Sequence, residues 1–308
     1  MKISAFSYVR NGIQLGYPFI EAIKSVLPLV DEFIVVVGDS TDGTRTAIEQ
    51  INNHKIKIID TLWDEAMRTK GIIFAQQSNI GLDNVSKDAD WLFHIQADEV
   101  IHEKDYDTIK KAMQKYLHDK RVEGFLFKFI NFFGDYNHWA PSRRFHQKEI
   151  RIIRNNSKYR SYKDSQGFRR FNDPVHYLQE KGYKLHVIPI NATVYHYSYV
   201  KNPHTQLKRS IEFGKRYNSN DEWIKDYTEN NTAGFNYNAI DFLYKYEGSH
   251  PAIMKTRIDA QDWVFNYDPS KNNMKFKDKV FKIIQDITGK QFFIYKNYKM
   301  VVFKPLCK

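Results

Sequence analysis

Acidic and amide side chains follow directly on an apolar run in the segment Asp90–Val100. Residues 91–95 are mostly apolar and typical of a buried strand, and Gln96, Asp98 and Glu99 come next. Polar groups at the carboxyl end of a buried strand lie where open α/β sheets bind ligands. Hard oxygen donors there suit Mg²⁺ or Mn²⁺, which commonly neutralise phosphates. The simpler alternative is that these acidic residues cap the helix that follows.

Two more polar loops follow predicted strands. Tyr8 to Asn11, which includes Arg10, comes after a strand over residues 3–8, and the turn from Gly38 to Thr44 comes after the apolar run 33–37. Asp39 in that turn can accept hydrogen bonds from a base or ribose, or serve only the geometry of the turn. Because parallel strands end at one edge of a sheet, we expect all three loops to meet in one crevice.

The elements that must position these loops alternate regularly. Strands are predicted over 3–8, 33–37, 56–59 and 91–95, with helices over 18–30, around 47–51 and over 70–86. This βαβ alternation requires helical crossovers and predicts an α/β fold with a doubly wound, mostly parallel, Rossmann-like sheet.

The pattern is looser after residue 105. Strands are predicted over 123–130, 149–154 and 183–196, and helical periodicity dominates from about residue 203. We therefore expect two regions, a sheet domain over 1–210 and a mainly helical region with a basic tail over 211–308.

Several of these segments together resemble one enzyme family. The run from Val30 to Thr44 is similar to the first signature of family 2 glycosyltransferases of the GT-A fold, and residues 79–82 are similar to the helix that follows it. Gln96-Ala97-Asp98-Glu99 stands where that family carries its metal-binding DxD motif. The resemblance covers about residues 1–210 and implies a GT-A-like sheet, a nucleotide-sugar donor and a divalent metal.

The sequence departs from the family pattern at two positions. Gln96 stands where the family usually has Asp, so Asp98 is the clearest carboxylate ligand, while Gln96 can still bond a ribose hydroxyl or a metal-bound water. The family acid after the second strand normally falls one or two positions before Asp39.

The resemblance also implies roles for two later residues. Asp164 is similar in position to the family's catalytic base, and a carboxylate there can take the proton of an attacking sugar hydroxyl. A structural ion pair is the alternative for Asp164, and Glu149 is a weaker rival for the base. His196 is similar to a further metal ligand of several GT-A enzymes, although a structural His is the alternative.

Other cations near the predicted crevice are candidates for binding phosphate or base. Arg10, Arg68 and Lys70 belong to this group, and Lys201, Lys208 and Arg209 follow His196. Each is equally compatible with a solvated surface charge.

The charge distribution and the cysteine content indicate which partners and which cellular location to expect. The net charge of +11 is concentrated in residues 143–170 and 271–308, each at +8, so anionic partners are expected at two places. The single Cys307 fits a reducing compartment, and no signal peptide or membrane-spanning run is apparent, so a cytoplasmic location is expected. No nucleic-acid recognition motif accompanies the charge, and nucleic acid is not an expected partner.

The basic tail indicates a membrane surface as a further partner. Residues 274–287 place apolar side chains near one helical face with lysines alongside, which suits peripheral attachment to an anionic membrane surface, here the inner face of the membrane. Packing of that helix on its own domain is the open alternative.

The leading hypothesis is a metal-dependent, inverting glycosyltransferase. It would move a hexose from a nucleoside-diphosphate sugar to a hydroxyl of a glycan or lipid-linked acceptor, as in polysaccharide biosynthesis, with Asp98 and His196 on Mn²⁺ or Mg²⁺ and Asp164 as base. Arg10, Asp39, Lys70 and Gln96 would contact the donor. Because Gln96 weakens a metal site, a non-catalytic nucleotide- or glycan-binding protein on the same scaffold is the alternative, and a nucleotidyltransferase is a third.

Overall fold

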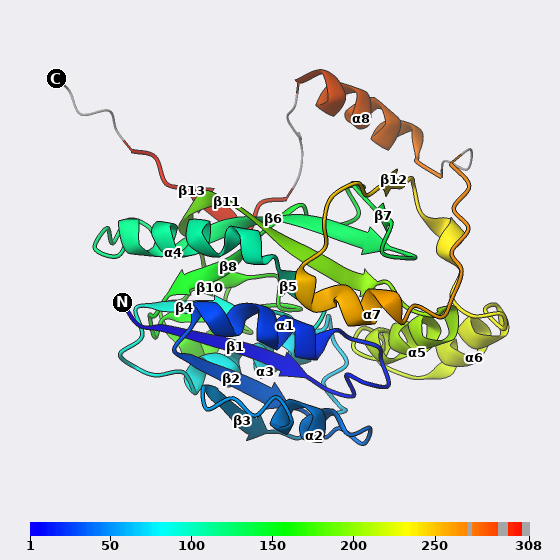
Figure 1. The fold of residues 1–308 in the computed structure, drawn as a ribbon. Coiled ribbons are helices and arrows are strands. Elements are labelled where there is room, and N and C mark those ends of the chain that lie inside the picture. The colour runs from blue at the N-terminus through cyan, green and yellow to red at the C-terminus, as the bar shows by residue number, and fades with distance from the viewer. Residues whose placement is uncertain (270–272, 289–294, 304–308) are drawn as a thin grey trace.

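The computed structural model describes residues 1–269, 273–288 and 295–303 (Figure 1). Cys307 and part of the predicted basic tail lie outside the described residues. The strands are β1 (Ile3–Val9), β2 (Glu32–Val37), β3 (Ile56–Asp60), β4 (Trp91–His94), β5 (Glu99–Ile101), β6 (Gly124–Phe133), β7 (His138–Trp139), β8 (Lys148–Arg154), β9 (Tyr159–Ser161), β10 (Phe168–Arg170), β11 (Tyr183–Tyr199), β12 (Tyr244–Lys245) and β13 (Tyr298–Met300). The α-helices are α1 (Phe19–Val26), α2 (Thr44–Glu49), α3 (Ile72–Asp83), α4 (Tyr106–Lys115), α5 (Pro203–Gly214), α6 (Glu222–Glu229), α7 (Lys255–Asp259) and α8 (Phe276–Thr288).

The sheet has a parallel half and a mixed half. Its path runs β3-β2-β1-β4-β8-β6-β11-β10-β9, and the first four strands are all parallel. Beyond β4 the order of directions changes, because β8 is antiparallel to both β4 and β6, while β6 is parallel to β11. The predicted α/β class is confirmed, and the predicted mostly parallel arrangement describes the half that contains β1 to β4.

Alternating side chains of the strands fill two cores. Ala5, Phe33 and Val35 face one side of the sheet, where they pack with residues of α1, α2 and α4. Their sequence neighbours, such as Phe6 and Ile34, face the other side, where they pack with residues of α3, β9 and β10. Strands buried on both faces read as continuous apolar runs, which is why the sequence pattern located them.

The chain after residue 200 packs against the ends of β6 and β11. Met254 joins a core with Phe132, Tyr195 and Tyr197, and Tyr237 belongs to a neighbouring core beside Phe133. This region holds α6, α7 and α8, but β13 also pairs in parallel with β11 of the main sheet. The predicted boundary at residue 210 falls within α5 and stays a prediction.

Most predicted elements have a counterpart in the structure. β1 to β4, β6, β8 and β11 match the predicted strands, and α1, α2, α3 and α8 match predicted helices. The short strands β5, β7, β9, β10, β12 and β13 were not predicted, because two or three residues carry no readable period. Within the described ranges, no helix is both long and apolar enough to cross a membrane.

Candidate functional site

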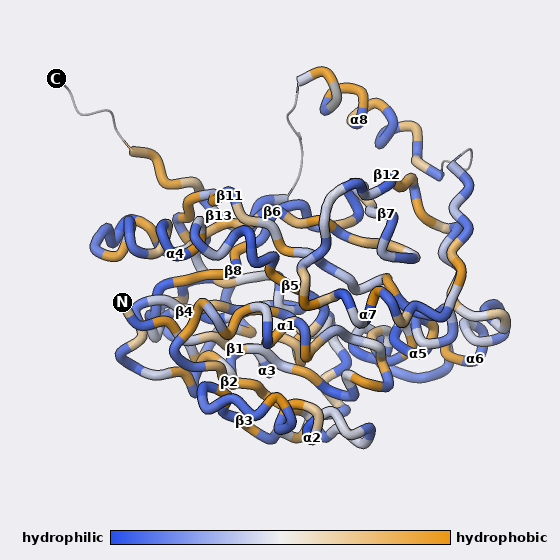
Figure 2. The backbone as a smooth tube through the Cα atoms, in the orientation of Figure 1, coloured by the Kyte–Doolittle hydropathy of each residue, from blue (hydrophilic) through white to orange (hydrophobic). Residues whose placement is uncertain are grey.

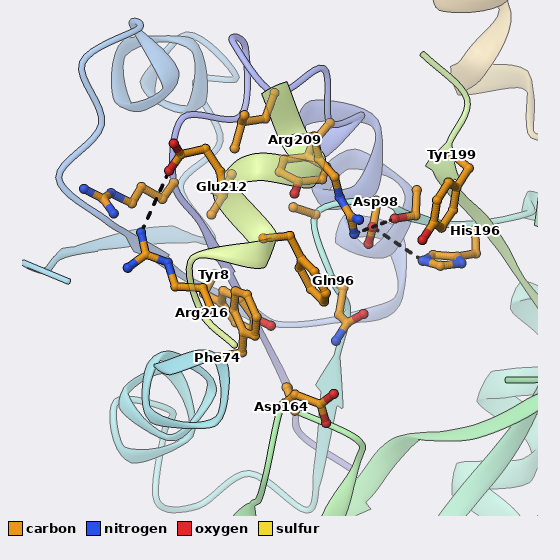
Figure 3. Close-up of a pocket in the computed structure, with 18 of the residues that line it drawn as sticks. Tyr8, Phe74, Gln96, Asp98, Asp164, His196, Tyr199, Arg209, Glu212 and Arg216 are labelled. Carbon is orange, nitrogen blue, oxygen red and sulfur yellow. Dashed lines mark hydrogen bonds and ion pairs between the residues drawn. The ribbon is translucent and has the colours of Figure 1, made fainter. Parts of the chain in front are cut away.

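A cavity of about 360 Å³ opens at the carboxyl edge of β1 and β4 (Figure 3). The loops after β1 and β4 form one wall, and α5, the end of β11 and the loop after β9 form the others. Seven of the candidate residues from the sequence line this cavity: Arg10, Gln96, Asp98, Glu149, Asp164, His196 and Arg209. The topology therefore brings together side chains that lie up to 200 positions apart in the sequence.

A fully buried ion pair anchors the loop after β4. The Arg151 guanidinium on β8 donates to both carboxylate oxygens of Glu99, at 2.7 and 2.5 Å. The Glu99 carboxylate also accepts from the Gln96 backbone N–H at 3.1 Å. Glu99 thus closes the turn that carries Gln96 and Asp98, and it is itself unavailable as a metal ligand.

Asp98 and His196 meet because β5 pairs with β11. His196 lies opposite Glu99 in the antiparallel register, and its Nε2 is 3.4 Å from Asp98 Oδ2. His196 Nδ1 lies 2.9 Å from Asn131 Oδ1, while the Asn131 amide nitrogen donates to the carbonyl of His146. Since Asn131 Oδ1 can only accept, Nδ1 carries a proton and Nε2 faces the carboxylate.

This arrangement suits a divalent cation. An imidazole whose Nδ1–H is held by an acceptor presents its Nε2 lone pair, and here that lone pair and an Asp98 oxygen converge. The described residues contain no group of three or more His, Cys, Asp or Glu side chains that could hold a metal, so a bound ion would need diphosphate or water oxygens to complete its coordination.

Positive charge surrounds Asp98. Burial opposes ionisation of this carboxyl, but His196, Lys201 and Arg209 outweigh burial and hold the pKa of Asp98 well below its usual range. Burial and the nearby Arg209 lower the pKa of Lys201 to about 7, although Asp98 opposes that shift. Arg209 donates to the Ser198 hydroxyl at 2.9 Å, and its buried Nε has no hydrogen-bond partner. This part of the cavity therefore carries positive charge that can bind an anion.

Asp164 lies on a strained loop after β9. Lys163 and Ser165 on either side of it have positive φ angles of 55° and 64°, a backbone conformation that residues other than Gly rarely adopt. Tyr217 donates to Asp164 Oδ2 at 2.9 Å, and Oδ1 is buried without a partner. In Figure 3, Gln96 lies between Asp164 and the pair formed by Asp98 and His196. Asp164 therefore offers a free acceptor oxygen to the cavity.

Glu149 is a second carboxyl at this end of the cavity. One of its oxygens is 3.1 Å from His146 Nδ1, and the other is buried without a partner. Burial raises the pKa of Glu149 to about 8; Arg151 opposes this shift and Glu99 adds to it. At neutral pH this group is mostly a neutral acid, whereas a general base must be ionised.

Arg10 and Arg216 form the opposite wall. Glu65 accepts from Arg10 at 2.6 Å and from Arg216 at 2.8 Å, and each guanidinium stacks on the Trp63 ring. Asp39 is not part of the cavity lining; its carboxylate accepts from Arg10 at 2.9 Å and from the Trp63 backbone at 3.2 Å. Asp39 therefore positions Arg10.

Three other predicted cations lie away from the lining. Lys70 is exposed in the loop before α3, and Lys208 is exposed on α5. Arg68 bonds the carbonyl of Lys215 and pairs with Asp221. The structure does not place these three with Asp98.

Sequence reasoning missed most of the α5 contribution. Arg209 was a candidate, but Glu212, Phe213 and Arg216 also line the cavity. With Arg209 they have the spacing i, i+3, i+4 and i+7, so one face of a predicted helix could have identified them. No comparable signal marks Trp63 or Tyr217, which reach the cavity from loop and helix-end positions.

Comparison with known proteins gives only distant matches. No family model matches the chain, and no curated protein matches it. Among solved structures, S. aureus TarS is similar over 69% of this chain and 39% of its own, at 15% identity and a TM-score of 0.37. Glucosyl-3-phosphoglycerate synthase from Mycobacterium tuberculosis matches over 42% of this chain and 43% of its own, at 18% identity and a TM-score of 0.30.

A third solved structure gives a match of the same kind. The 4-diphosphocytidyl-2C-methyl-D-erythritolsynthase from Anaerococcus prevotii matches over 69% of this chain and 94% of its own, at 12% identity and a TM-score of 0.35. The chain spans well under two thirds of TarS and of glucosyl-3-phosphoglycerate synthase. Likenesses at these TM-scores do not assign a function.

The buried ion pair generates a stability prediction. Arg151→Met should lower the free energy of unfolding by roughly 3–5 kcal/mol, because it leaves the Glu99 charge buried without a partner. The double variant Glu99→Leu/Arg151→Met should recover much of that loss. Urea unfolding measures both, with Arg121→Met in an exposed pair as the control, expected to cost far less. An Arg151→Met loss no larger than the control would contradict the role of the pair.

The raised pKa of Glu149 generates a pH prediction. A carboxyl with a folded pKa of about 8 and an unfolded pKa near 4.5 stabilises the fold fully below pH 4.5, and this contribution is lost as the pH rises to 8. Relative to wild type, Glu149→Gln should therefore gain stability between these pH values, by at most about 1.4 kcal/mol per pH unit. Unfolding midpoints at several pH values test this, and parallel curves for the two proteins would count against it.

Proposed function

We propose that the protein is a metal-dependent, inverting glycosyltransferase of the family 2 type that uses a nucleoside-diphosphate sugar. The observation that supports this most is the convergence of the Asp98–His196 pair, the cations around it and Asp164 on one cavity. A sugar donor carries its negative charge on the diphosphate and reacts at the adjoining carbon. The reaction therefore needs cations beside a carboxylate that accepts a proton, and this cavity holds both.

The diphosphate would lie against Asp98, His196 and Arg209. A Mn²⁺ or Mg²⁺ ion held by Asp98 and His196 would supply positive charge to the leaving diphosphate, and the imidazole favours Mn²⁺. Gln96 would bond a ribose hydroxyl or a metal-bound water. Arg10 and Arg216 would stabilise the nucleotide end, with Asp39 and Glu65 holding them in place.

Asp164 would act as the base. Its unpartnered Oδ1 would accept the proton of the acceptor hydroxyl as that oxygen forms the bond to the anomeric carbon. The bond from that carbon to the diphosphate breaks in the same displacement, and the nucleoside diphosphate leaves with the electron pair. Attack from the side opposite the leaving group inverts the anomeric centre, as the family resemblance implies.

Asp98→Asn tests the metal and diphosphate site. We expect loss of donor hydrolysis and transfer, together with loss of the Mn²⁺-dependent part of nucleoside-diphosphate binding, because the amide carries no charge. Calorimetry and a donor-hydrolysis assay over a panel of nucleotide sugars give both readouts. Asp88→Asn, at an exposed position, is the control. Full activity in Asp98→Asn would rule the assignment out.

Asp164→Asn tests the base. We expect turnover to fall by roughly 10²-fold or more with donor affinity unchanged, because the amide cannot take the proton. Tyr217→Phe removes the hydrogen bond to Asp164 while retaining the carboxylate, and we expect a smaller fall. Equal turnover in wild type and Asp164→Asn would transfer the role to another group, with Glu149 the first to test.

The second candidate function is a non-catalytic nucleotide- or glycan-binding protein on this scaffold. Gln96 favours it, because an amide in place of a carboxylate leaves Asp98 and His196 as the metal ligands among the described residues. Binding of nucleoside diphosphates without hydrolysis or transfer on any acceptor would support the binder. A nucleotidyltransferase would release pyrophosphate instead.

We also propose peripheral attachment to an anionic membrane through α8, which stands clear of the sheet (Figure 2). Five apolar side chains of α8 are 36–82% exposed: Phe276, Val280, Ile283, Ile284 and Ile287. At about 100° per residue they fall within an arc of about 100° on the helix, with Lys277 and Lys279 at its two edges. An apolar stripe bordered by lysines suits the interface of an anionic bilayer.

Cosedimentation with vesicles tests the attachment. Wild type should bind vesicles that contain phosphatidylglycerol and release from them as salt rises, while Ile283→Gln/Ile287→Gln should bind much less. Val175→Gln, at an exposed site outside α8, is the matched control. If the double variant and wild type sediment equally at low salt, α8 does not attach the protein.

A further inference from the structure

A second, larger hollow adjoins the candidate active site. This groove, of about 1220 Å³, lies between α8, the loop over residues 140–148, the exposed face of β6, β8 and β11, and residues 295–300. Its volume exceeds the ~300–1,000 Å³ that is usual for small-molecule sites. The groove and the first cavity share Arg144, Phe145, His146 and Glu149, so the two are continuous. A chain lying in the groove would have its end beside the proposed catalytic groups.

The groove lining is rich in cations. Six Lys or Arg side chains face three acids: Lys128, Arg143, Arg144, Lys148, Lys282 and Lys296 against Glu149, Asp241 and Asp278. Asp241 is already engaged by the Ser142 hydroxyl and by Arg144. Burial keeps Glu149 mostly neutral at pH 7. The groove therefore has a net positive charge.

Two of these lysines face each other without an acid between them. Lys128 on β6 and Lys148 on β8 are direct cross-strand partners, and like charges at such positions destabilise a sheet. The Lys128 ammonium donates to Asn191 at 3.0 Å, and within the described part of the chain no acid pairs with Lys128 or Lys148. An anion bound between them would remove this repulsion.

Aromatic rings belong to the same lining as the cations. Trp139, Phe145, Tyr244 and Tyr298 belong to the lining, and Lys282 stacks on the rings of Phe242 and Tyr244. Flat aromatic faces pack against the apolar faces of sugar rings, and cations pair with acidic substituents. The volume, the positive charge and the aromatic content of the groove together suit a chain of sugars that carries acidic groups.

We propose that this groove binds an extended anionic glycan and presents its terminal hydroxyl to the first cavity at Glu149 and Asp164. The proposal rests on the proposed function for the direction of the chain, and it names the acceptor class as an acidic oligosaccharide. Lys128 and Lys148 would hold acidic groups in the middle of the groove. Arg144 would lie nearest the reacting end.

Calorimetry with defined oligosaccharides tests the proposal on the full-length protein. The probe is an oligogalacturonate of four to six residues, with a neutral malto-oligosaccharide of equal length for comparison. Wild type should bind the acidic chain with salt-dependent affinity and the neutral chain far more weakly. Lys128→Gln and Lys148→Gln should each weaken binding by roughly tenfold, as expected for loss of one charge-assisted contact. Lys225→Gln, at an exposed position on α6, should change nothing.

Parallel titration with nucleoside diphosphate separates this proposal from the proposed function. The groove variants should keep wild-type nucleotide affinity, since neither lysine lines the first cavity. Equal binding of the acidic and neutral chains, or unchanged affinity in both lysine variants, would overturn the groove assignment even if the enzyme transfers sugar. Tighter binding of a single-stranded oligonucleotide, lost in the same variants, would overturn it in favour of nucleic acid.

Discussion

The buried pair of Arg151 and Glu99 is the interaction on which the rest of the site depends. Both charges are almost entirely removed from water, which is tolerable only because the guanidinium engages both carboxylate oxygens and a backbone N–H satisfies one of them further. The pair links β8 to β5 across the middle of the sheet. It fixes the turn that carries Asp98, and the pairing of β5 with β11 then brings His196 to that carboxylate.

The electrostatics of the cavity follow from burial. Asp98 stays ionised because its interactions with His196, Lys201 and Arg209 outweigh burial. Burial raises the pKa of Glu149 to about 8, and the neighbouring acids Glu99 and Asp164 add to this shift although Arg151 opposes it. Two carboxyl groups in one cavity thus have opposite protonation states at neutral pH. This separation is a common feature of sites that perform acid–base chemistry, because one group must hold charge and another must exchange protons.

The later part of the chain completes the surfaces around the cavity. α5 contributes one face of cationic and aromatic side chains, and β13 returns to pair with β11 beside the groove. α8 lies over the groove with Asp278 and Lys282 toward it and its apolar stripe turned to solvent. This apolar stripe, turned to solvent, is the feature on which the proposed membrane attachment rests. The same helix therefore relates the proposed membrane surface to the proposed acceptor groove.

The sequence alone determined the elements that have strong local signals. Continuous apolar runs identified β1, β2 and β4, because strands buried on both faces have no polar side, and the βαβ alternation then required parallel neighbours and one ligand-binding edge. That edge was enough to gather Arg10, Gln96 and Asp98. The family resemblance added Asp164 and His196, which the structure also brings to this cavity.

Tertiary structure alone decided which neighbours each side chain has. Asp39 and Arg10 look like equal candidates in the sequence, yet a 2.9 Å ion pair makes Asp39 the support and Arg10 the lining residue. Lys70 stands between Arg10 and Asp98 along the chain and yet lies outside the cavity. Tertiary contacts also decide three further features. These are the raised pKa of Glu149, the cross-strand lysines of the groove and the antiparallel direction of β8 relative to β4. Each depends on pairing between strands or on exclusion of water, and these are set by contacts between distant segments that leave no local period in the sequence.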